Sequence, residues 1–194
     1  MKIALYIKND DDELSTLLIS KIGEYGFEFD QDNPDVVIFV GGDGTLLRAV
    51  HEFANKINNL SFVGINNGSL GYCCGYDIKE VDRLFNDLLN NNFEIKPHKL
   101  IKVSFNNETL YALNEVRIEN PFHTLISDVF IDNEFFETFR GNGLNISSNF
   151  GSSAYNKSLG GSVVLLNSDI IQLTEIAPIN NKIYSSFNSS NRFN

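Results

Sequence analysis

The first half of the chain alternates short apolar runs with amphipathic stretches. Three apolar runs have the length of β-strands: residues 3–7, 35–40 and 61–65. Three stretches carry apolar side chains at the spacing of helices that bury one face: residues 14–25, 45–57 and 80–89. The run 35–40 is continuous and rich in β-branched residues, which is typical of a strand buried on both faces of a parallel sheet. The alternation predicts a doubly wound parallel α/β layer.

The pattern changes near Phe93, after which strand-like runs dominate. They cover residues 94–106, 109–118, 125–131 and 135–147. Asn106-Asn107 and Asp132-Asn133 stand between runs, where we expect hairpin turns, and a short helical stretch is expected over 154–158. The sequence therefore predicts an α/β domain over 1–92 and an antiparallel β-rich domain over 93–194, with a site between them.

Composition narrows the possible partners. The chain has 194 residues, 42% of them hydrophobic and 21% charged, and a net charge of −10, as expected of a folded acidic protein. Such a charge argues against general binding to nucleic acids or anionic membranes, and no apolar run is long enough to span a bilayer. The chain opens directly on an apolar strand without room for a signal peptide, and Cys73-Cys74 suits two reduced, buried thiols. We therefore expect a cytoplasmic protein.

A glycine-rich turn, Gly41–Thr45, follows the buried strand and opens a helix. Ligands of parallel sheets bind at this end of the strands, and glycines allow the backbone to approach a phosphate. Asp43 would repel a phosphate, so it suits a group that deprotonates an attacking hydroxyl or holds a divalent cation. The alternative is a tight turn with Asp43 near the helix N-cap. Arg48, one turn later, either faces phosphate or is a solvated helix residue.

Three more segments carry polar residues in a recognisable order: Asn66–Tyr72, Asn114-Glu115 and Gly151–Gly161. Each alone is more often a turn or a solvated strand position. Together with Gly41–Thr45 and Gly141-Asn142-Gly143, they resemble the NAD kinase family over nearly the whole chain. GGDGT is shared with diacylglycerol and sphingosine kinases, whereas the Asn-Glu pair followed by Gly-Ser-Ser-Ala-Tyr is specific to NAD kinases.

The resemblance implies transfer of a phosphoryl group from ATP, or from polyphosphate, to the 2′-hydroxyl of the adenosine ribose of NAD. It makes Asp43 the catalytic base, with Gly44 beside it. Asn114 and Glu115 are implied to hold the ribose hydroxyls or the nicotinamide end of NAD. A divalent cation, Mg²⁺ with ATP, is implied as the cofactor. It would neutralise the phosphate charge in place of a basic pocket, so that an acidic chain could bind an anionic substrate.

The resemblance also implies a nucleotide-binding segment in the second half. Its residues are Ser153, Ala154, Tyr155, Asn156, Lys157 and Ser158, with Tyr155 offering a ring for stacking. Ala177 matches a family position that lines the nucleotide pocket. Arg140 precedes the Gly-x-Gly turn, where family members reach NAD from a neighbouring subunit. A homodimer or homotetramer is therefore implied.

Three departures from the family pattern motivate alternatives. Asn142 replaces the aspartate of Gly-Asp-Gly, and Asn149-Phe150 replace a proline and a small hydroxyl residue. The family continues through further strands after the segment matching 180–184, so the second domain is expected to be incomplete, with a polar tail over 185–194 that has little core-forming pattern. The alternatives are a lipid kinase of the GGDGT superfamily and a catalytically weak NAD(P)-binding remnant.

Overall fold

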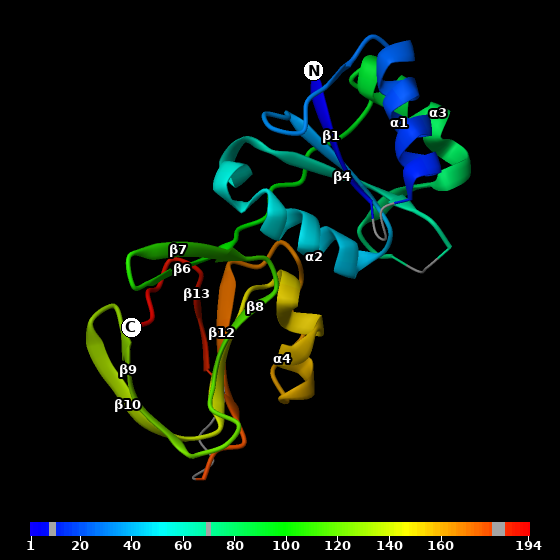
Figure 1. Cartoon of the computed structure of the whole chain (residues 1–194). Coiled ribbons are helices and arrows are strands. Elements are labelled where there is room, and N and C mark those ends of the chain that lie inside the picture. The colour runs from blue at the N-terminus through cyan, green and yellow to red at the C-terminus, as the bar shows by residue number, and fades with distance from the viewer. Residues whose placement is uncertain (8–10, 69–70, 180–184) are drawn as a thin grey trace. The chain divides into compact units, whose positions relative to one another are not determined.

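The computed structural model describes residues 1–7, 11–68, 71–179 and 185–194, and Figure 1 traces them by residue number. The chain forms two compact units, Met1–Pro97 and His98–Asn194. The expected division at 92/93 into independent domains stays a prediction. Among the described residues, no helix is both long and apolar enough to cross a membrane.

The first unit is built on a parallel sheet of five strands in the order β2-β1-β3-β4-β5. The strands are β1 (Lys2–Ile7), β2 (Glu28–Phe29), β3 (Val36–Val40), β4 (Ser61–Asn66) and β5 (Cys74–Asp77). The helices are α1 (Asp12–Glu24), α2 (Asp43–Glu52), α3 (Val81–Leu89) and the 3₁₀ turns η1 (Ala54–Asn59) and η2 (Ile78–Glu80). The strand order reverses between β1 and β3, which confirms the doubly wound parallel layer.

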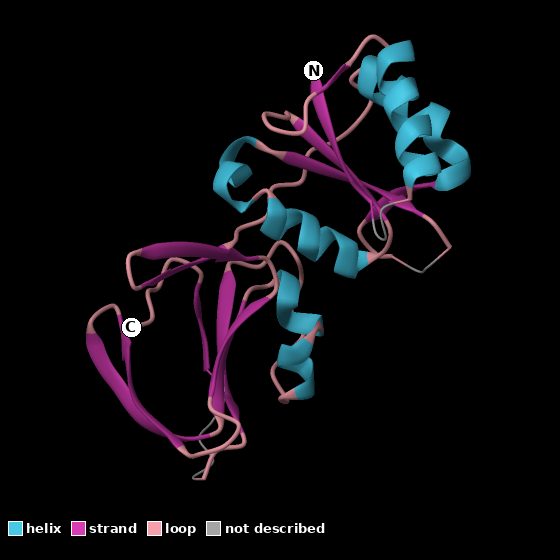
Figure 2. Ribbon diagram, viewed as in Figure 1, coloured by secondary structure: helices cyan, strands magenta, loops and turns pink. Residues whose placement is uncertain are grey.

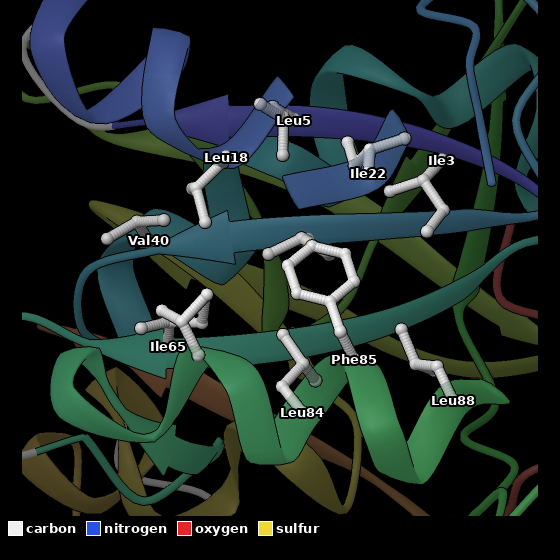
Figure 3. Packing of buried hydrophobic residues seen from close by; sticks show 11 residues of the cluster. Ile3, Leu5, Leu18, Ile22, Val40, Ile65, Leu84, Phe85 and Leu88 are labelled. Carbon is white, nitrogen blue, oxygen red and sulfur yellow. The ribbon is translucent and has the colours of Figure 1, made fainter. Parts of the chain in front are cut away.

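Helices cover both faces of this sheet, as the colouring by secondary structure shows (Figure 2). Alternate residues of β1, β3 and β4 pack against α1 and α3; among them are Ile3, Ile38 and Ile65 (Figure 3). Phe85 of α3 lies in the middle of that cluster and is fully buried. The opposite face packs Ala4 and Val37 against Phe53 at the end of α2. Because β3 is central, all of its side chains are buried, as its continuous apolar run predicts.

The second unit is antiparallel. Its four-stranded sheet has the order β13-β12-β11-β8, and β6-β7 and β9-β10 form separate two-stranded ribbons. The strands are β6 (Ile101–Phe105), β7 (Glu108–Ala112), β8 (Glu115–Glu119), β9 (Leu125–Ile131), β10 (Glu134–Gly141), β11 (Gly143–Ser147), β12 (Ile170–Ile176) and β13 (Ser185–Asn188). The helical pieces are η3 (Phe150–Ser153) and α4 (Tyr155–Ser158). The expected antiparallel β-rich class is confirmed.

Both expected hairpin turns are confirmed. Asn106 and Asn107 have positive φ angles and join β6 to β7, and Asp132 and Asn133 do the same between β9 and β10. Two consecutive left-handed residues match the twist of the flanking strands, and asparagine and aspartate tolerate that conformation.

Several expected strand boundaries are wrong. Residues 94–100 are not a strand, and Pro97 within them lacks a backbone N–H for pairing. The run 109–118 divides at Leu113 and Asn114, whose carbonyls accept hydrogen bonds from Ser148. The run 135–147 divides at Asn142, where the chain leaves its pairing with β9 and joins the four-stranded sheet. In the first unit the expected helix 45–57 divides at Phe53, and the short strands β2 and β5 were not expected.

The C-terminal residues contribute more to the core than their polar pattern predicts. β13 pairs with β12, and the backbones of Phe130 and Asn194 exchange two hydrogen bonds of 2.9 Å. Phe187 and Phe193 stack edge to face and pack against the buried cluster of the unit. Two isolated aromatic residues within a polar stretch carry no periodic signal, which is why the pattern missed them. The predicted matching segment 180–184 lies outside the described residues.

Candidate active site

The glycine-rich turn stands at the carboxyl end of β3 and leads into α2. Gly41 has a φ of +144°, and a Cβ there would stand 2.2 Å from Oγ1 of Thr45. Its N–H donates to the carbonyl of Ile65 on the neighbouring strand at 2.9 Å. Position 41 therefore requires glycine for both its backbone conformation and its space.

Asp43 is the first residue of α2 and does not cap it. Gly42 is the N-cap, and no side-chain cap bond is present at this described helix end. Oδ1 of Asp43 instead accepts the backbone N–H of Cys73 at 3.0 Å. This contact ties the turn after β3 to the segment that leads into β5. Asp43 stands next to the N-cap, as the alternative interpretation of the turn expects, but its side chain makes no capping bond.

Two residues of α2 and two cysteines are relevant to the environment of Asp43. Gly44 is exposed, with nothing within 4 Å of an added Cβ, and Arg48 is also exposed on α2. Cys74 donates from Sγ to the carbonyl of Gly41 at 3.0 Å. Burial, followed by a hydrogen bond to Asp43, raises the pKa of Cys73 to about 12. Both cysteines are free and partly buried, and the thiol of Cys73 stays protonated near neutral pH.

The segment Asn66–Tyr72 is described only in part, because Ser69 and Leu70 lie outside the described residues. Gly71 approaches the glycine-rich turn closely: an added Cβ would stand 3.3 Å from Cα of Gly42 and 3.6 Å from Oδ1 of Asp43. The two motifs of the first unit are therefore in contact through Gly71 and Cys73.

In the second unit, Asn114 and Glu115 stand where β8 begins. The carbonyl of Asn114 accepts the N–H of Ser148, and Gly151 packs so closely that a Cβ there would meet that carbonyl at 2.2 Å. Oε2 of Glu115 is buried and finds no partner within the described part of the chain. Burial raises the pKa of the Glu115 carboxyl, and Arg117 opposes that shift. A buried acceptor without a donor is the group that a ligand hydroxyl would satisfy.

Arg117 and Tyr155 form a contact that the sequence patterns did not indicate. The guanidinium of Arg117 lies 4.8 Å from the centre of the Tyr155 ring, within the range of a cation–π interaction. Nη1 of Arg117 also stands 3.5 Å from Glu119. Because residues two apart on a strand share a face, Arg117 could have been placed beside Glu115 from spacing alone.

Asn156 occupies the interior of the second unit. It is fully buried, its amide donates to the Ser162 carbonyl at 3.4 Å, and its Oδ1 accepts from Thr174 at 3.4 Å. Gly161 leaves the space for this side chain, since a Cβ at 161 would stand 2.4 Å from it. These contacts give Asn156 a structural role, and a contact with nucleotide stays a prediction.

The other predicted residues of this segment face outward to different degrees. Ser153, Lys157 and Ser158 are exposed, and Ala154 is half-buried. Asn149, one of the departures, donates through its amide to the carbonyls of Leu166 and Ser168. The Phe150 ring meets His98 edge to face, with centroids 5.3 Å apart.

Asn142, Arg140 and Ala177 lie close together where β10 and β12 end and β11 begins. Asn142 donates from its amide to the carbonyl of Asn120 at 3.2 Å, a bond that an ionised aspartate could not donate. Arg140 is exposed, and its carbonyl accepts the N–H of Ile179. Ala177 is exposed with a φ of +44°, an uncommon conformation for a residue with a Cβ.

The next feature is the set of side chains that could hold a metal ion. The described residues include no group of three or more His, Cys, Asp or Glu side chains that could hold a metal ion. Mg²⁺ in kinases is commonly held by one or two carboxylates together with substrate phosphates.

The sequence is similar to a known protein family. Residues 8–93 match the family model described as the ATP-NAD kinase N-terminal domain. The chain is 37% identical to NAD kinase 1 of Bacillus cereus over 197 residues, covering 97% of the chain and 74% of that protein. It is 38% identical to the NAD kinase of Limosilactobacillus reuteri, covering 97% and 73%. The chain belongs to the NAD kinase family.

Solved structures agree on the fold of this NAD kinase family member. Yeast NADH kinase complexed with NADH superposes with a TM-score of 0.78 at 20% identity, covering all of this chain and 71% of that one. An NAD kinase from Archaeoglobus fulgidus in complex with ATP gives 0.78 at 21% identity, covering 100% and 79%. Membership of the family assigns NAD kinase function, that of a phosphotransferase enzyme, and does not favour a lipid kinase.

Proposed function

We propose that the chain phosphorylates the 2′-hydroxyl of the adenosine ribose of NAD, with Asp43 as the base. The observation that supports this role most directly is the contact between Asp43 and Cys73. The Asp43 carboxylate does not cap its own helix, and one of its oxygens is held by the N–H of Cys73. Its other oxygen is suited to accept a proton. A positioned base contributes roughly 10²–10⁴-fold to such a reaction.

Residues at the end of β3 would serve the phosphoryl donor. Gly44 presents backbone without a side chain at the start of α2, where amide groups favour negative charge. Arg48 is exposed one turn later and is a candidate for a phosphate contact. The donor is ATP or polyphosphate, and a divalent cation such as Mg²⁺ would neutralise its phosphate charge when bound.

Residues of the second unit would bind NAD. Glu115 offers a buried carboxylate oxygen to a ribose hydroxyl, with Asn114 beside it. Tyr155 offers its ring to a base, and the segment around it adds further contacts. The remaining proposed binding residues are Arg140, Asn142, Ser153, Ala154, Asn156, Lys157, Ser158 and Ala177.

Location and assembly are also part of the proposal. Two free thiols suit a reducing cytoplasm. The exposed Arg140 at the end of β10 suits a contact with NAD bound by a second copy in a homodimer or homotetramer. Light scattering coupled to size-exclusion chromatography measures the assembly directly.

The test of the reaction compares the unchanged chain with Asp43→Asn. NADP formed from NAD, ATP and Mg²⁺ is measured by a coupled assay, and NAD binding by calorimetry. We expect Asp43→Asn to lower kcat by about 10²-fold or more while NAD binding is kept. A folded wild-type chain that binds NAD but forms no NADP with either donor contradicts the proposal.

A further inference from the structure

Cys73 is the residue that touches Asp43 most directly, and the proposed reaction gives it no role. We infer that Cys73 is a positioning residue that holds the Asp43 carboxylate in one orientation. Its backbone N–H donates to one oxygen of the carboxylate, so that the other oxygen remains to meet the substrate hydroxyl, and its thiol lies beside the carboxylate. The inference rests on the proposed role of Asp43 as the base.

The contacts converge on one side of Asp43. The N–H of Cys73 donates to Oδ1 at 3.0 Å. The thiol of the same residue lies beside the carboxylate, which contributes to raising the pKa of the thiol. Both groups belong to the residue just before β5, whereas Asp43 follows β3, so the contact joins two segments distant in the sequence. Cys73 therefore approaches the carboxylate with both its backbone and its side chain.

The segment that carries Cys73 is itself fixed to the turn. The thiol of Cys74 donates to the carbonyl of Gly41 at 3.0 Å, and Gly41 in turn donates to Ile65 of β4 at 2.9 Å. Gly71 has no side chain at a position where a Cβ would stand 3.1 Å from Sγ of Cys74. The donors on Cys73 therefore cannot move independently of the backbone that carries Asp43.

Asp43 needs this support because its own helix does not provide it. It stands in the first turn of α2, it is only half-buried, and it makes no capping bond. An unsupported carboxylate at that position would rotate among several side-chain conformations. Misplacing a reacting group by about 1 Å costs up to about 10²-fold in rate.

The thiol acts here as a donor and not as a nucleophile. Burial and the neighbouring carboxylate raise the pKa of Cys73 to about 12, so the proton stays on sulfur throughout the neutral range. Serine would supply an O–H donor of similar size at the same place, whereas alanine supplies none. These two substitutions separate hydrogen bonding from packing.

The experiment measures kcat and the KM for NAD in Cys73→Ala and Cys73→Ser with NAD, ATP and Mg²⁺. We expect Cys73→Ala to lower kcat by about tenfold with KM within about twofold, and Cys73→Ser to restore most of kcat. The matched control is Tyr76→Phe, which removes a side-chain donor of β5, the strand that follows Cys73; this donor bonds Asp87 and not Asp43. We expect it to leave kcat unchanged.

A double-mutant comparison tests whether Cys73 acts through Asp43. In the Asp43→Asn background, measured by chromatography of NADP after long incubation, Cys73→Ala should cause no further loss. An equal loss in both backgrounds, or a wild-type kcat in Cys73→Ala, overturns the inference. If Cys73→Ala does not fold, Gly71→Ala is the second variant, and it should lower kcat by displacing the same segment. Absence of NADP with the wild-type chain would instead contradict the proposed function.

Discussion

The guanidinium of Arg117 lies 4.8 Å from the centre of the Tyr155 ring, so one face of that ring is occupied by a cation. Arg117 also stands 3.5 Å from Glu119, and the Arg117 side chain is 48% exposed. The contact joins β8 to α4 and fixes the orientation of the ring that is proposed to meet a base.

Replacing Arg117 with Met tests this contact. Met keeps much of the aliphatic length but loses the cation, so we expect the Kd for NAD to rise about three- to tenfold, with a smaller effect on kcat. Calorimetry and steady-state kinetics measure the two quantities. Arg117→Lys, which retains a cation, is the control. Its Kd for NAD should lie between those of the wild type and Arg117→Met. Unchanged NAD affinity in Arg117→Met would contradict a role for the contact in binding.

Glu115 allows a prediction about pH. Burial raises its pKa in the folded chain above the ordinary value of 4.5. Above 4.5 the unfolded chain has lost this proton while the folded chain still holds it, so stability falls as pH rises through the window up to the raised pKa. The ionised carboxylate therefore costs stability at neutral pH.

Glu115→Gln removes that cost. We expect the difference in unfolding free energy between Glu115→Gln and the wild type to increase from about pH 4 to about pH 7, measured by urea denaturation. The same variant should bind NAD more weakly, because the oxygen proposed to accept a ribose hydroxyl is partly lost. A variant that is more stable and binds equally well would contradict the proposed ligand role.

Gly44 separates the requirements of folding from those of phosphate binding. An added Cβ at 44 meets nothing, and alanine is a better helix former, so Gly44→Ala should stabilise the chain by about 0.5–1 kcal/mol. We expect the KM for ATP to rise nevertheless, because the added methyl group would obstruct the approach of phosphates to the backbone. Gly41→Ala is the contrasting variant and should destabilise by about 1–3 kcal/mol, since its φ is +144° and its space is filled. Thermal unfolding distinguishes the two.

Asn142→Asp restores the family's residue at the cost of a hydrogen bond. The amide of Asn142 donates to the Asn120 carbonyl, and a carboxylate would instead face that carbonyl with a second acceptor. We expect a loss of about 1–2 kcal/mol in the free energy of unfolding. Urea denaturation measures this loss. Asn145→Asp is not a suitable control, because the Asn145 side chain is fully buried. Equal or higher stability of Asn142→Asp would show that the amide bond is not needed.

The parts of the fold with strong periodicity could be predicted from the sequence. The burial of β3, the helix faces of α1 and α3 and the asparagine-rich hairpin turns follow from local patterns. The division of the long β runs at Asn142 and at Asn114 could not, because those breaks depend on hydrogen bonds to Ile176 and Ser148, which are distant in the sequence. The core role of Phe193 was missed for the same reason.

The candidate site divides along similar lines. Motif resemblance indicated Asp43 and the Asn114-Glu115 pair, whose roles remain proposals. It gave no signal for Cys73, because that contact runs mainly through a backbone N–H, which every residue except proline carries. Arg117 had an available signal in its spacing from Glu115, whereas its contact with Tyr155 depends on how α4 packs.

The complete burial of β3 constrains how this chain can vary while remaining active. Its side chains are buried inside the sheet layer, and together they set the position of Gly41 and hence that of the proposed base. Apolar exchanges of similar volume are the substitutions that such a strand tolerates. Among active copies of this chain, sequence drift in β3 should therefore be confined to exchanges such as Val for Ile, and a polar residue there should mark a copy that has lost activity.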